Sequence, residues 1–186
     1  VKKVTRTEDR VELTFPDGTS QIFDEVILAC HADQSLRLID SPSADEVALL
    51  ESFPYEKNVV SLHSDDSLLP RRKSARASWN AYLSQESKRQ AVVTYDMNIL
   101  QSLPTDEPFC VSLNQRNEIR KSAMHREFEF SHPTFHSGRK EAQRRHDEFI
   151  RRRGISLCGA YWGYGFHEDG LKSGLRVCKA FGASLG

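Results

Sequence analysis

The segment from residue 154 to residue 182 constrains the fold more than any other part of the sequence. It opens with the apolar run Ile155 to Cys158, continues through a stretch rich in glycine and aromatic residues, and ends in an amphipathic pattern. A short apolar run beside a glycine is typical of a buried strand. A buried strand that leads towards a helix predicts α/β packing, in which the helix covers a face of a sheet.

The amphipathic pattern predicts a helix with Asp169 as its N-cap and a glycine at position 182 as its end. Gly170 and Gly174 have no side chain, so a ligand or another backbone can come close. The start of such a helix carries free N–H groups and a partial positive charge, which favour an anion or an electron-rich carbonyl. The face predicted to be buried consists of Leu171, Gly174, Leu175, Cys178 and Phe181.

The aromatic residues before this helix follow neither the period of a strand nor that of a helix. Aromatic residues that only fill a core normally follow one of these periods. Glycines beside aperiodic aromatic residues therefore favour a loop that presses against a large flat ligand over a loop that fills the core. The residues in question are Tyr161, Trp162, Tyr164 and Phe166.

Other readings of this segment are weaker. Gly163 and Gly165 do not complete a dinucleotide-binding fingerprint, because Glu168 stands where the third glycine is required. A hydrolase could pair Cys158 with His167, but Cys158 continues the apolar strand and is more simply a core residue.

No metal site is expected. His132 and His136 have the spacing of a shared metal face on a helix, but Pro133 between them opposes a regular helix. The four cysteines are scattered through apolar stretches and form no C-x-x-C pair, which predicts reduced thiols and a cytoplasmic location.

Charge and hydropathy exclude several classes of protein. The chain has 26 Lys and Arg residues and 26 Asp and Glu residues, so its formal net charge is zero. A dedicated nucleic-acid or membrane-surface protein needs an excess of cations. The apolar runs are also strand-sized, whereas a membrane span needs about 20 apolar residues. We therefore expect neither a nucleic-acid partner nor a membrane span.

The rest of the chain falls into two parts. A strand pair, an apolar run at 26–30, a helix at 32–39 and a Ser43–Glu46 capping box predict an α/β part. Strand-like segments without helices between them then predict an antiparallel sheet. They lie at 57–63, 75–83, 90–98, 108–113 and 124–130.

A charged helix is predicted around residues 141–150, and we interpret it as a solvated face rather than a nucleic-acid patch. The polar residues of the predicted sheet, His63, Asp65, Asp66 and Asn80, are interpreted as surface or turn groups. No residue can be assigned as a catalytic acid or base. The first residue is Val1, and a strand-like residue pattern begins directly after it. We therefore expect that an amino-terminal part of the same chain precedes it.

The stretch from Leu157 to Arg176 resembles the carboxy-terminal flavin-binding motif of the flavin-containing amine oxidase superfamily. It looks closest to bacterial proteins described as predicted NAD/FAD-binding oxidoreductases. The stretch from Phe23 to Asp33 is similar to a flavin-domain strand of that family, which also follows a hairpin. The resemblance covers nearly the whole chain.

The resemblance implies an α/β plus α+β chain. Residues 1–52 and 150–186 would belong to a Rossmann-like FAD-binding domain, and residues 53–149 would form an inserted antiparallel-sheet substrate domain with a charged helix. The backbone at Gly159 and Ala160 would approach the pyrophosphate or ribityl chain of FAD. The amides of Gly170 and Leu171 would face the N1/C2=O edge of the flavin ring, and Phe166 would face the substrate.

The residues expected to bind the cofactor are Gly159, Ala160, Tyr161, Trp162, Phe166, Glu168, Asp169, Gly170 and Leu171. Two departures from the family are visible. Many members carry Glu or Thr where this chain has Ala160, and Lys57 is only near the place of a strand lysine that often holds water beside flavin N5.

The function implied by the resemblance is that of the carboxy-terminal part of an FAD-dependent oxidoreductase, which transfers hydride from a small-molecule substrate C–H to flavin. The alternative is a structural or binding remnant that lacks the adenosine-binding half and catalyses nothing. The two differ in whether the full protein carries flavin.

Overall fold

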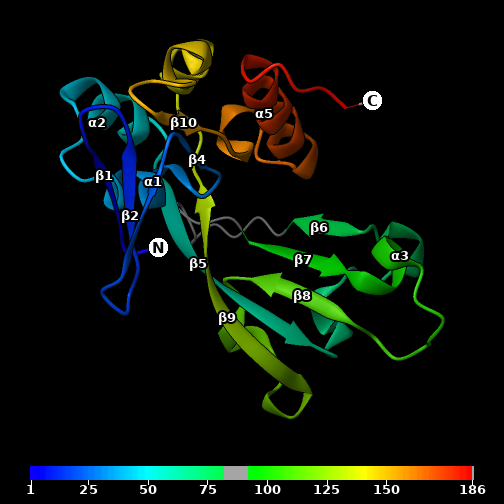
Figure 1. Ribbon diagram of the computed structural model, residues 1–186. Coiled ribbons are helices and arrows are strands. Elements are labelled where there is room, and N and C mark those ends of the chain that lie inside the picture. Colours follow the sequence, from blue (N-terminus) through cyan, green and yellow to red (C-terminus); the bar gives the residue numbers. More distant parts are fainter. Residues whose placement is uncertain (82–91, 186) are drawn as a thin grey trace. The chain divides into compact units, whose positions relative to one another are not determined.

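The computed structural model describes residues 1–81 and 92–185. The chain forms two compact units: residues 1–55 with 133–186, and residues 56–132. The first unit is mixed α/β and the second is built on one sheet, as Figure 1 shows. Within the described residues, no helix has the length and apolarity needed to cross a membrane.

The first unit begins with an antiparallel three-stranded sheet, β1 (Lys3–Arg6), β2 (Val11–Thr14) and β3 (Ser20–Phe23). The turn between β2 and β3 is held by Asp17, whose carboxylate accepts hydrogen bonds from the N–H and hydroxyl of Thr19 at 3.0 and 2.7 Å. The predicted strand–turn–strand pattern is therefore present.

A second, parallel pair joins segments far apart in the sequence. Strand β4 (Val26–Leu28) lies beside β10 (Ile155–Leu157), with Ser156 opposite Ile27. In the described chain β10 is the neighbour of β4, so Ile27 remains 47% exposed. A continuous apolar run such as 26–30 is typical of a strand buried on both faces, and the exposure of Ile27 shows that this strand is not.

Helix α1 (Ala32–Leu38) and helix α2 (Ala44–Glu51) follow β4. The predicted capping box of α2 is confirmed: the Ser43 hydroxyl accepts from the Glu46 N–H at 3.3 Å, and the Glu46 carboxylate accepts from the Ser43 N–H at 2.8 Å. Helices α4 (Arg139–Arg144) and α5 (His167–Ala180) complete the unit.

The core of the first unit gathers side chains from β1, β2, β4, β10, α1, α2 and α4 and from the segments between elements. Phe53 and Phe149 are each 1% exposed and are the largest fully buried side chains. The other buried members are Val4, Val11, Leu28, Ala32, Ile39, Leu49, Leu50, Ala142, Ile155, Leu157 and Tyr161.

The second unit is a five-stranded sheet in the order β6-β7-β8-β5-β9. Its members are β5 (Tyr55–His63), β6 (Trp79–Ala81), β7 (Val93–Asp96), β8 (Cys110–Leu113) and β9 (Met124–Pro133). A short helix, α3 (Met97–Gln101), follows β7. Pairs β6–β7, β7–β8 and β8–β5 are antiparallel, as predicted. Residues 82, 83, 90 and 91 of the predicted strands lie outside the described residues.

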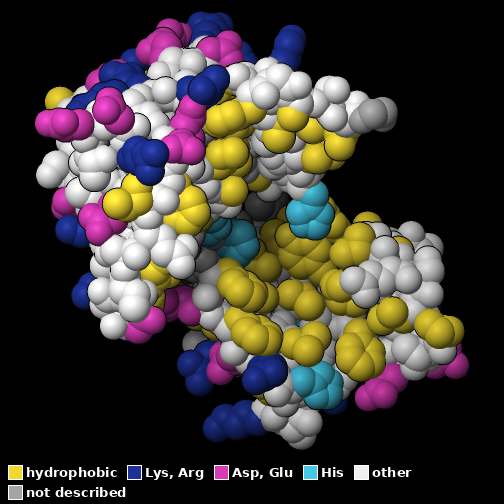
Figure 2. Space-filling view, in the orientation of Figure 1, with side chains coloured by type: hydrophobic (Ala, Val, Ile, Leu, Met, Phe, Trp, Pro, Cys, Tyr) yellow, Lys and Arg dark blue, Asp and Glu magenta, His cyan; other side chains and the backbone are white. Residues whose placement is uncertain are grey.

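The strand register sorts the side chains of this sheet by face. Directly paired residues share a face, and Figure 2 shows the hydrophobic side chains gathered over the sheet. One face carries Val60, Leu62, Trp79, Ala81, Val93, Tyr95, Val111 and Leu113. The opposite face carries Ser61, His63, Asn80, Thr94, Asp96, Cys110 and Ser112.

The boundary between the units differs from the predicted one. Residues 133–149 belong to the first unit rather than to the sheet. The reason is packing, because Phe149 lies in the core of the first unit and Arg139 bonds to backbone carbonyls of residues 161 and 163. The predicted charged helix at 141–150 is also shorter, since α4 ends at Arg144 and a 3₁₀ turn covers residues 146–149.

Helix α5 does not bury its predicted face. Leu171 is 52% exposed and Phe181 is 41% exposed, whereas the buried residues of the helix are Ser173 and Val177. A Cβ built on Gly174 meets nothing within 4 Å, so no other part of the described chain approaches there. The helix therefore turns its polar Ser173 inwards and leaves the two ends of its apolar stripe, Leu171 and Phe181, exposed.

Candidate functional site

The site predicted from the sequence is the loop between β10 and α5. Gly159 follows β10 with a φ of 154°, and its N–H donates to the Ser173 hydroxyl at 2.8 Å. A Cβ at this position would lie 2.7 Å from the ring of Tyr161. Glycine is thus required here by the close packing of Tyr161.

A buried clamp holds the loop after this glycine. Arg139 Nη2 donates to the carbonyls of Tyr161 and Gly163 at 3.2 and 3.0 Å. Gln143 Nε2 donates to the same two carbonyls at 2.9 and 2.7 Å. Both residues lie on α4, so this helix fixes the backbone of the loop. The sequence analysis missed this role, because nothing in the local pattern pairs residue 139 with residue 161.

Two of the four predicted ligand-facing aromatic residues pack in or against the core instead. Tyr161 is 2% exposed, packs against Phe53 with ring centroids 4.9 Å apart, and has its pKa raised by burial. Trp162 stacks on His146 at 4.1 Å, and its ring lies edge-on to Phe53. The expectation of a loop pressed against a flat ligand is therefore wrong for the buried ring of Tyr161, whereas Trp162 is partly buried at the edge of the core. Tyr164 and Phe166 remain exposed, at 69% and 58%.

Helix α5 begins three residues earlier than predicted. Phe166 is its N-cap, and Asp169 is the third residue of the first turn rather than the cap. The Asp169 carboxylate accepts from the N–H groups of Tyr164 and Phe166, each at 3.0 Å. This side chain reaches back and orders the chain entering the helix.

The first turn also decides which amides are open. The N–H groups of Asp169 and Gly170 both donate to the Phe166 carbonyl, at 3.1 and 3.2 Å. The Gly170 amide is therefore not the free donor that the resemblance implied. In the described chain, the N–H groups at the start of α5 that bond to no acceptor are those of His167 and Glu168.

The remaining predicted residues lie around this opening. Ala160 starts a 3₁₀ turn over residues 160–162, and its carbonyl accepts from the Gly165 N–H at 3.1 Å. Glu168 is exposed and forms an ion pair with Lys172 at 3.5 Å. Glu168 and Leu171 are exposed at the start of α5. The structure also brings the loop against this helix, since a Cβ on Gly170 would lie 3.9 Å from Ala160 and the Gly159 N–H bonds to Ser173.

The chain matches solved structures of several enzymes. A CLA-producing fatty acid isomerase from P. acnes matches with a TM-score of 0.62 and 12% identity, over 98% of this chain and 47% of that one. Putrescine oxidase bound to putrescine matches with a TM-score of 0.60 and 13% identity, over 97% and 47%. Cyclohexylamine oxidase from Brevibacterium oxydans IH-35A matches with a TM-score of 0.57 and 12% identity, over 97% and 47%.

The resemblance to the flavin-containing amine oxidase superfamily is confirmed at the level of the fold. The chain spans about half the length of these structures, 47% in each case. No protein-family model and no curated protein matches the sequence.

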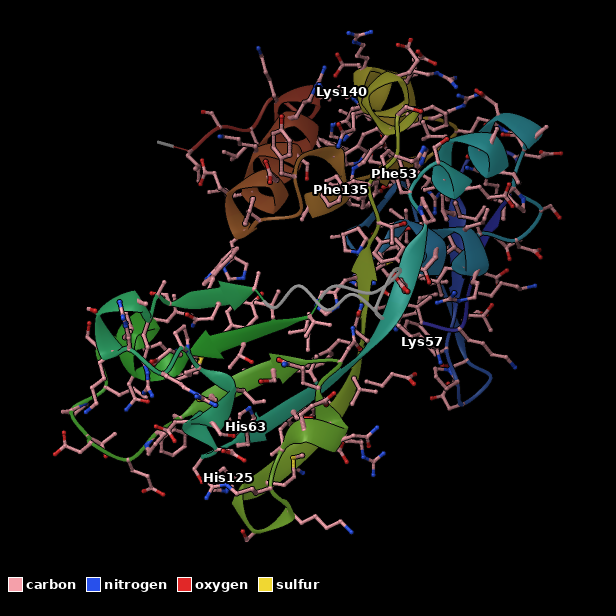
Figure 3. All side chains as sticks on the ribbon, turned by 180° about the vertical axis from the view of Figure 1, so that it is seen from behind. Phe53, Lys57, His63, His125, Phe135 and Lys140 are labelled. Carbon is pink, nitrogen blue, oxygen red and sulfur yellow. The ribbon has the colours of Figure 1, made fainter. Side chains whose placement is uncertain are left out.

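The structure also places Lys57, considered for the family's strand lysine, and Cys158, considered as the nucleophile of a hydrolase. Lys57, labelled in Figure 3, forms an ion pair with Glu129 at 2.6 Å, and its side chain is 73% exposed. Cys158 is 7% exposed, and burial raises the pKa of its thiol, which opposes the thiolate that a cysteine nucleophile needs.

The polar residues interpreted as surface groups include a buried chain of hydrogen bonds in the second unit. The Asp65 N–H donates to His63 Nδ1 at 3.2 Å, so Nε2 carries the proton and donates to the Ser112 hydroxyl at 2.8 Å. Ser112 then donates to Thr94 at 2.7 Å, because the Thr94 hydroxyl donates to Gln115 Oε1 at 2.7 Å.

This chain corrects the interpretation of His63 and Asp65, which are each 0% exposed. Burial lowers the pKa of His63, which keeps the imidazole neutral. Its Nε2 is the donor towards Ser112 and so cannot act as a base for that hydroxyl. The constellation is therefore structural rather than a serine nucleophile with its base.

Proposed function

We propose that this chain is the carboxy-terminal part of an FAD-dependent oxidoreductase of the amine oxidase type, in which a substrate C–H is oxidised. The observation that carries the proposal is the opening of α5, where the His167 and Glu168 amides bond to no acceptor in the described chain. The fold shared with putrescine oxidase and cyclohexylamine oxidase supports it.

The residues that would hold the cofactor fit a negatively polarised ring edge. Two open N–H groups and the positive end of the 14-residue helix α5 point out of the same turn. Asp169 keeps this turn in place through its bonds to Tyr164 and Phe166. Arg139 and Gln143 hold the backbone of the preceding loop, because both donate to the Tyr161 carbonyl. Gly159 and Ala160 follow β10, where backbone rather than side chains would face the cofactor.

A bound flavin would supply the redox chemistry by accepting a hydride. The chain's own contribution is electrostatic and positional: preorganised N–H donors stabilise negative charge on the ring edge that faces them. Phe166, 58% exposed beside those amides, would present an aromatic face to the small-molecule substrate.

His167→Pro tests this assignment in the protein expressed from the full reading frame. His167 is the first residue of α5, where proline is well tolerated, and the substitution removes one open N–H without removing a helix hydrogen bond. Phe166 before it is already extended, with a ψ of 164°. We expect flavin affinity to fall about tenfold, the equivalent of one hydrogen bond of ~1.4 kcal/mol.

The matched control is His167→Ala, which keeps the N–H and should bind flavin as the parent does. Flavin content is measured by absorbance after denaturation, and folding by thermal unfolding. Equal flavin affinity in His167→Pro and His167→Ala contradicts the assignment of these amides. A full-length protein that carries no flavin contradicts the proposed function itself and favours the remnant that catalyses nothing.

A further inference from the structure

A cavity of about 350 Å³ lies in the first unit, between α4, the segment before it and the loop after Trp162. Its walls include Phe135, His136, Arg139, Lys140, Gln143 and Tyr164. Its size is that of a pocket for a small organic molecule. None of its lining residues is among those predicted to bind the cofactor, so this cavity is separate from the proposed flavin site.

At the floor of the cavity lies the buried guanidinium of Arg139, which forms no ion pair with the described residues. Arg139 is 2% exposed, and no Asp or Glu among the described residues forms an ion pair with it. Its bonds go to carbonyls of Thr134, Tyr161 and Gly163. A buried charge of this kind is costly unless an opposite charge offsets it. Burial also lowers the pKa of Arg139, which reflects the same cost.

A second cation lies at the same cavity. Lys140 follows Arg139 on α4, is exposed, and forms no ion pair within the described part of the chain. His136 is uncharged: its Nδ1 accepts from the Gly138 N–H at 3.2 Å, so its Nε2 donates to the Ser52 carbonyl at 2.8 Å. Among the described residues, the cavity is lined by Arg139 and Lys140 and by no Asp or Glu. Asp169 packs behind Gly163 and offsets part of the Arg139 charge.

Aromatic faces complete the walls. Phe135 is 59% exposed and Tyr164 is 69% exposed. The Arg139 guanidinium lies 4.1 Å from the centre of the Phe135 ring and 5.7 Å from that of Phe53. Figure 3 labels Phe53, Phe135 and Lys140. Stacked on the buried guanidinium, the Phe135 ring is held in place while one side of it stays open to a flat partner.

We propose that this cavity binds a small organic anion, with a flat apolar body against Phe135 and Tyr164 and its negative group towards Lys140 and the charge of Arg139. The proposal does not depend on the flavin site. A neutral molecule of the same shape would gain the stacking but not the electrostatic attraction, and this difference makes the inference testable.

The probe is 2-naphthoate, compared with the neutral 2-naphthamide, titrated into the full chain and followed by amide chemical shifts in nuclear magnetic resonance. We expect 2-naphthoate to bind about tenfold more tightly, because Lys140 at the cavity and the buried charge of Arg139 attract its carboxylate. The shifts should be centred on residues 135–143 and 163–164. Lys140→Ala should reduce this preference severalfold, and Phe135→Ala should weaken both ligands.

The control is Lys172→Ala, which removes an exposed cation of α5 that does not line the cavity. It should leave both affinities unchanged. Lys140 and Phe135 are both exposed, so their variants are expected to fold. Equal affinity for the acid and the amide, an unchanged preference in Lys140→Ala, or shifts centred elsewhere would each overturn the proposal. Loss of flavin binding in a cofactor assay would not bear on it.

Discussion

At the scale of single residues, the second unit depends on the fully buried carboxylate of Asp65. Asp65 is 0% exposed and accepts hydrogen bonds from the N–H groups of Ser67 and Arg120 at 3.1 and 2.9 Å, and from Arg120 Nε at 3.0 Å. Burial alone would raise the pKa of Asp65, but these hydrogen bonds outweigh it and hold the pKa well below its ordinary value of 3.8.

Asp65→Asn should lower the free energy of unfolding at neutral pH by about 1–3 kcal/mol, because the amide cannot accept all three bonds. The pKa is lower in the folded state, so the parent gains stability as pH rises through the acid range up to about 4 and keeps it above. The variant lacks this gain. Urea unfolding between pH 2 and pH 7, a range set by the usual carboxyl pKa, measures this effect. The free energies of unfolding of the parent and the variant should converge at the acid end. A difference between them that stays constant with pH would contradict the assignment.

Asp169 offers a second test at this scale, because its carboxylate joins the loop at 164–166 to α5. Asp169→Ala removes the acceptor for the Tyr164 and Phe166 amides and should cost about 1 kcal/mol of stability. Glu168→Ala is the matched control, since it loses only an exposed ion pair of 3.5 Å and should change stability by a few tenths of a kcal/mol at most. Urea unfolding distinguishes the two, and equal losses would contradict the capping role.

At the scale of elements, the sheet of the second unit separates an apolar face from a buried polar face. The polar chain from His63 through Ser112 and Thr94 to Gln115 crosses three strands and the turn after β8. Each member is satisfied by the next, so the loss of one leaves a buried neighbour without its partner.

Thr94→Val tests this chain with little change in shape. The substitution leaves the Ser112 hydroxyl and the Gln115 oxygen unsatisfied in the interior, so we expect a loss of about 1–3 kcal/mol in thermal or urea unfolding. Thr105→Val is the control, because Thr105 is exposed and its hydroxyl accepts one bond, from the Glu107 N–H. A Thr94→Val protein as stable as the control would show that the chain contributes nothing.

At the scale of the whole molecule, apolar surface remains open on the first unit. Leu171 and Phe181 on α5 are 52% and 41% exposed, and Ile27 on β4 is 47% exposed. Larger apolar patches of this kind mark surfaces that another polypeptide covers. If the chain is half of an amine oxidase-like protein, as we propose, the other half would cover them.

The 186-residue chain alone should therefore associate with itself. Leu171→Gln should reduce this association without lowering the unfolding temperature, because Leu171 is 52% exposed. Val177→Gln, at a position 1% exposed, is the control and should destabilise the chain by several kcal/mol. Sedimentation velocity and thermal unfolding measure the two effects. A monomeric parent chain at high concentration would contradict the expectation.

Much of the fold could be predicted from the sequence, because interactions between neighbouring residues determine where its helices and strands form. The Ser43–Glu46 capping box, the strand pattern of 57–63 and 108–113, and the strand at 155–157 depend on neighbouring residues, so their signals can be read along the chain. The resemblance to the amine oxidase fold rests on the order of such local signals, and the fold bears it out.

Tertiary structure alone decided which faces are buried and which polar groups are paired. Asp169 is the third residue of α5 because its carboxylate accepts from the amides of residues 164 and 166. Tyr161 is a core residue because Phe53, in the segment after α2, packs against it. Arg139 serves the loop at 161–163 through a contact more than twenty residues away. Such partners come together only when the chain packs, and their burial rather than their spacing sets their roles.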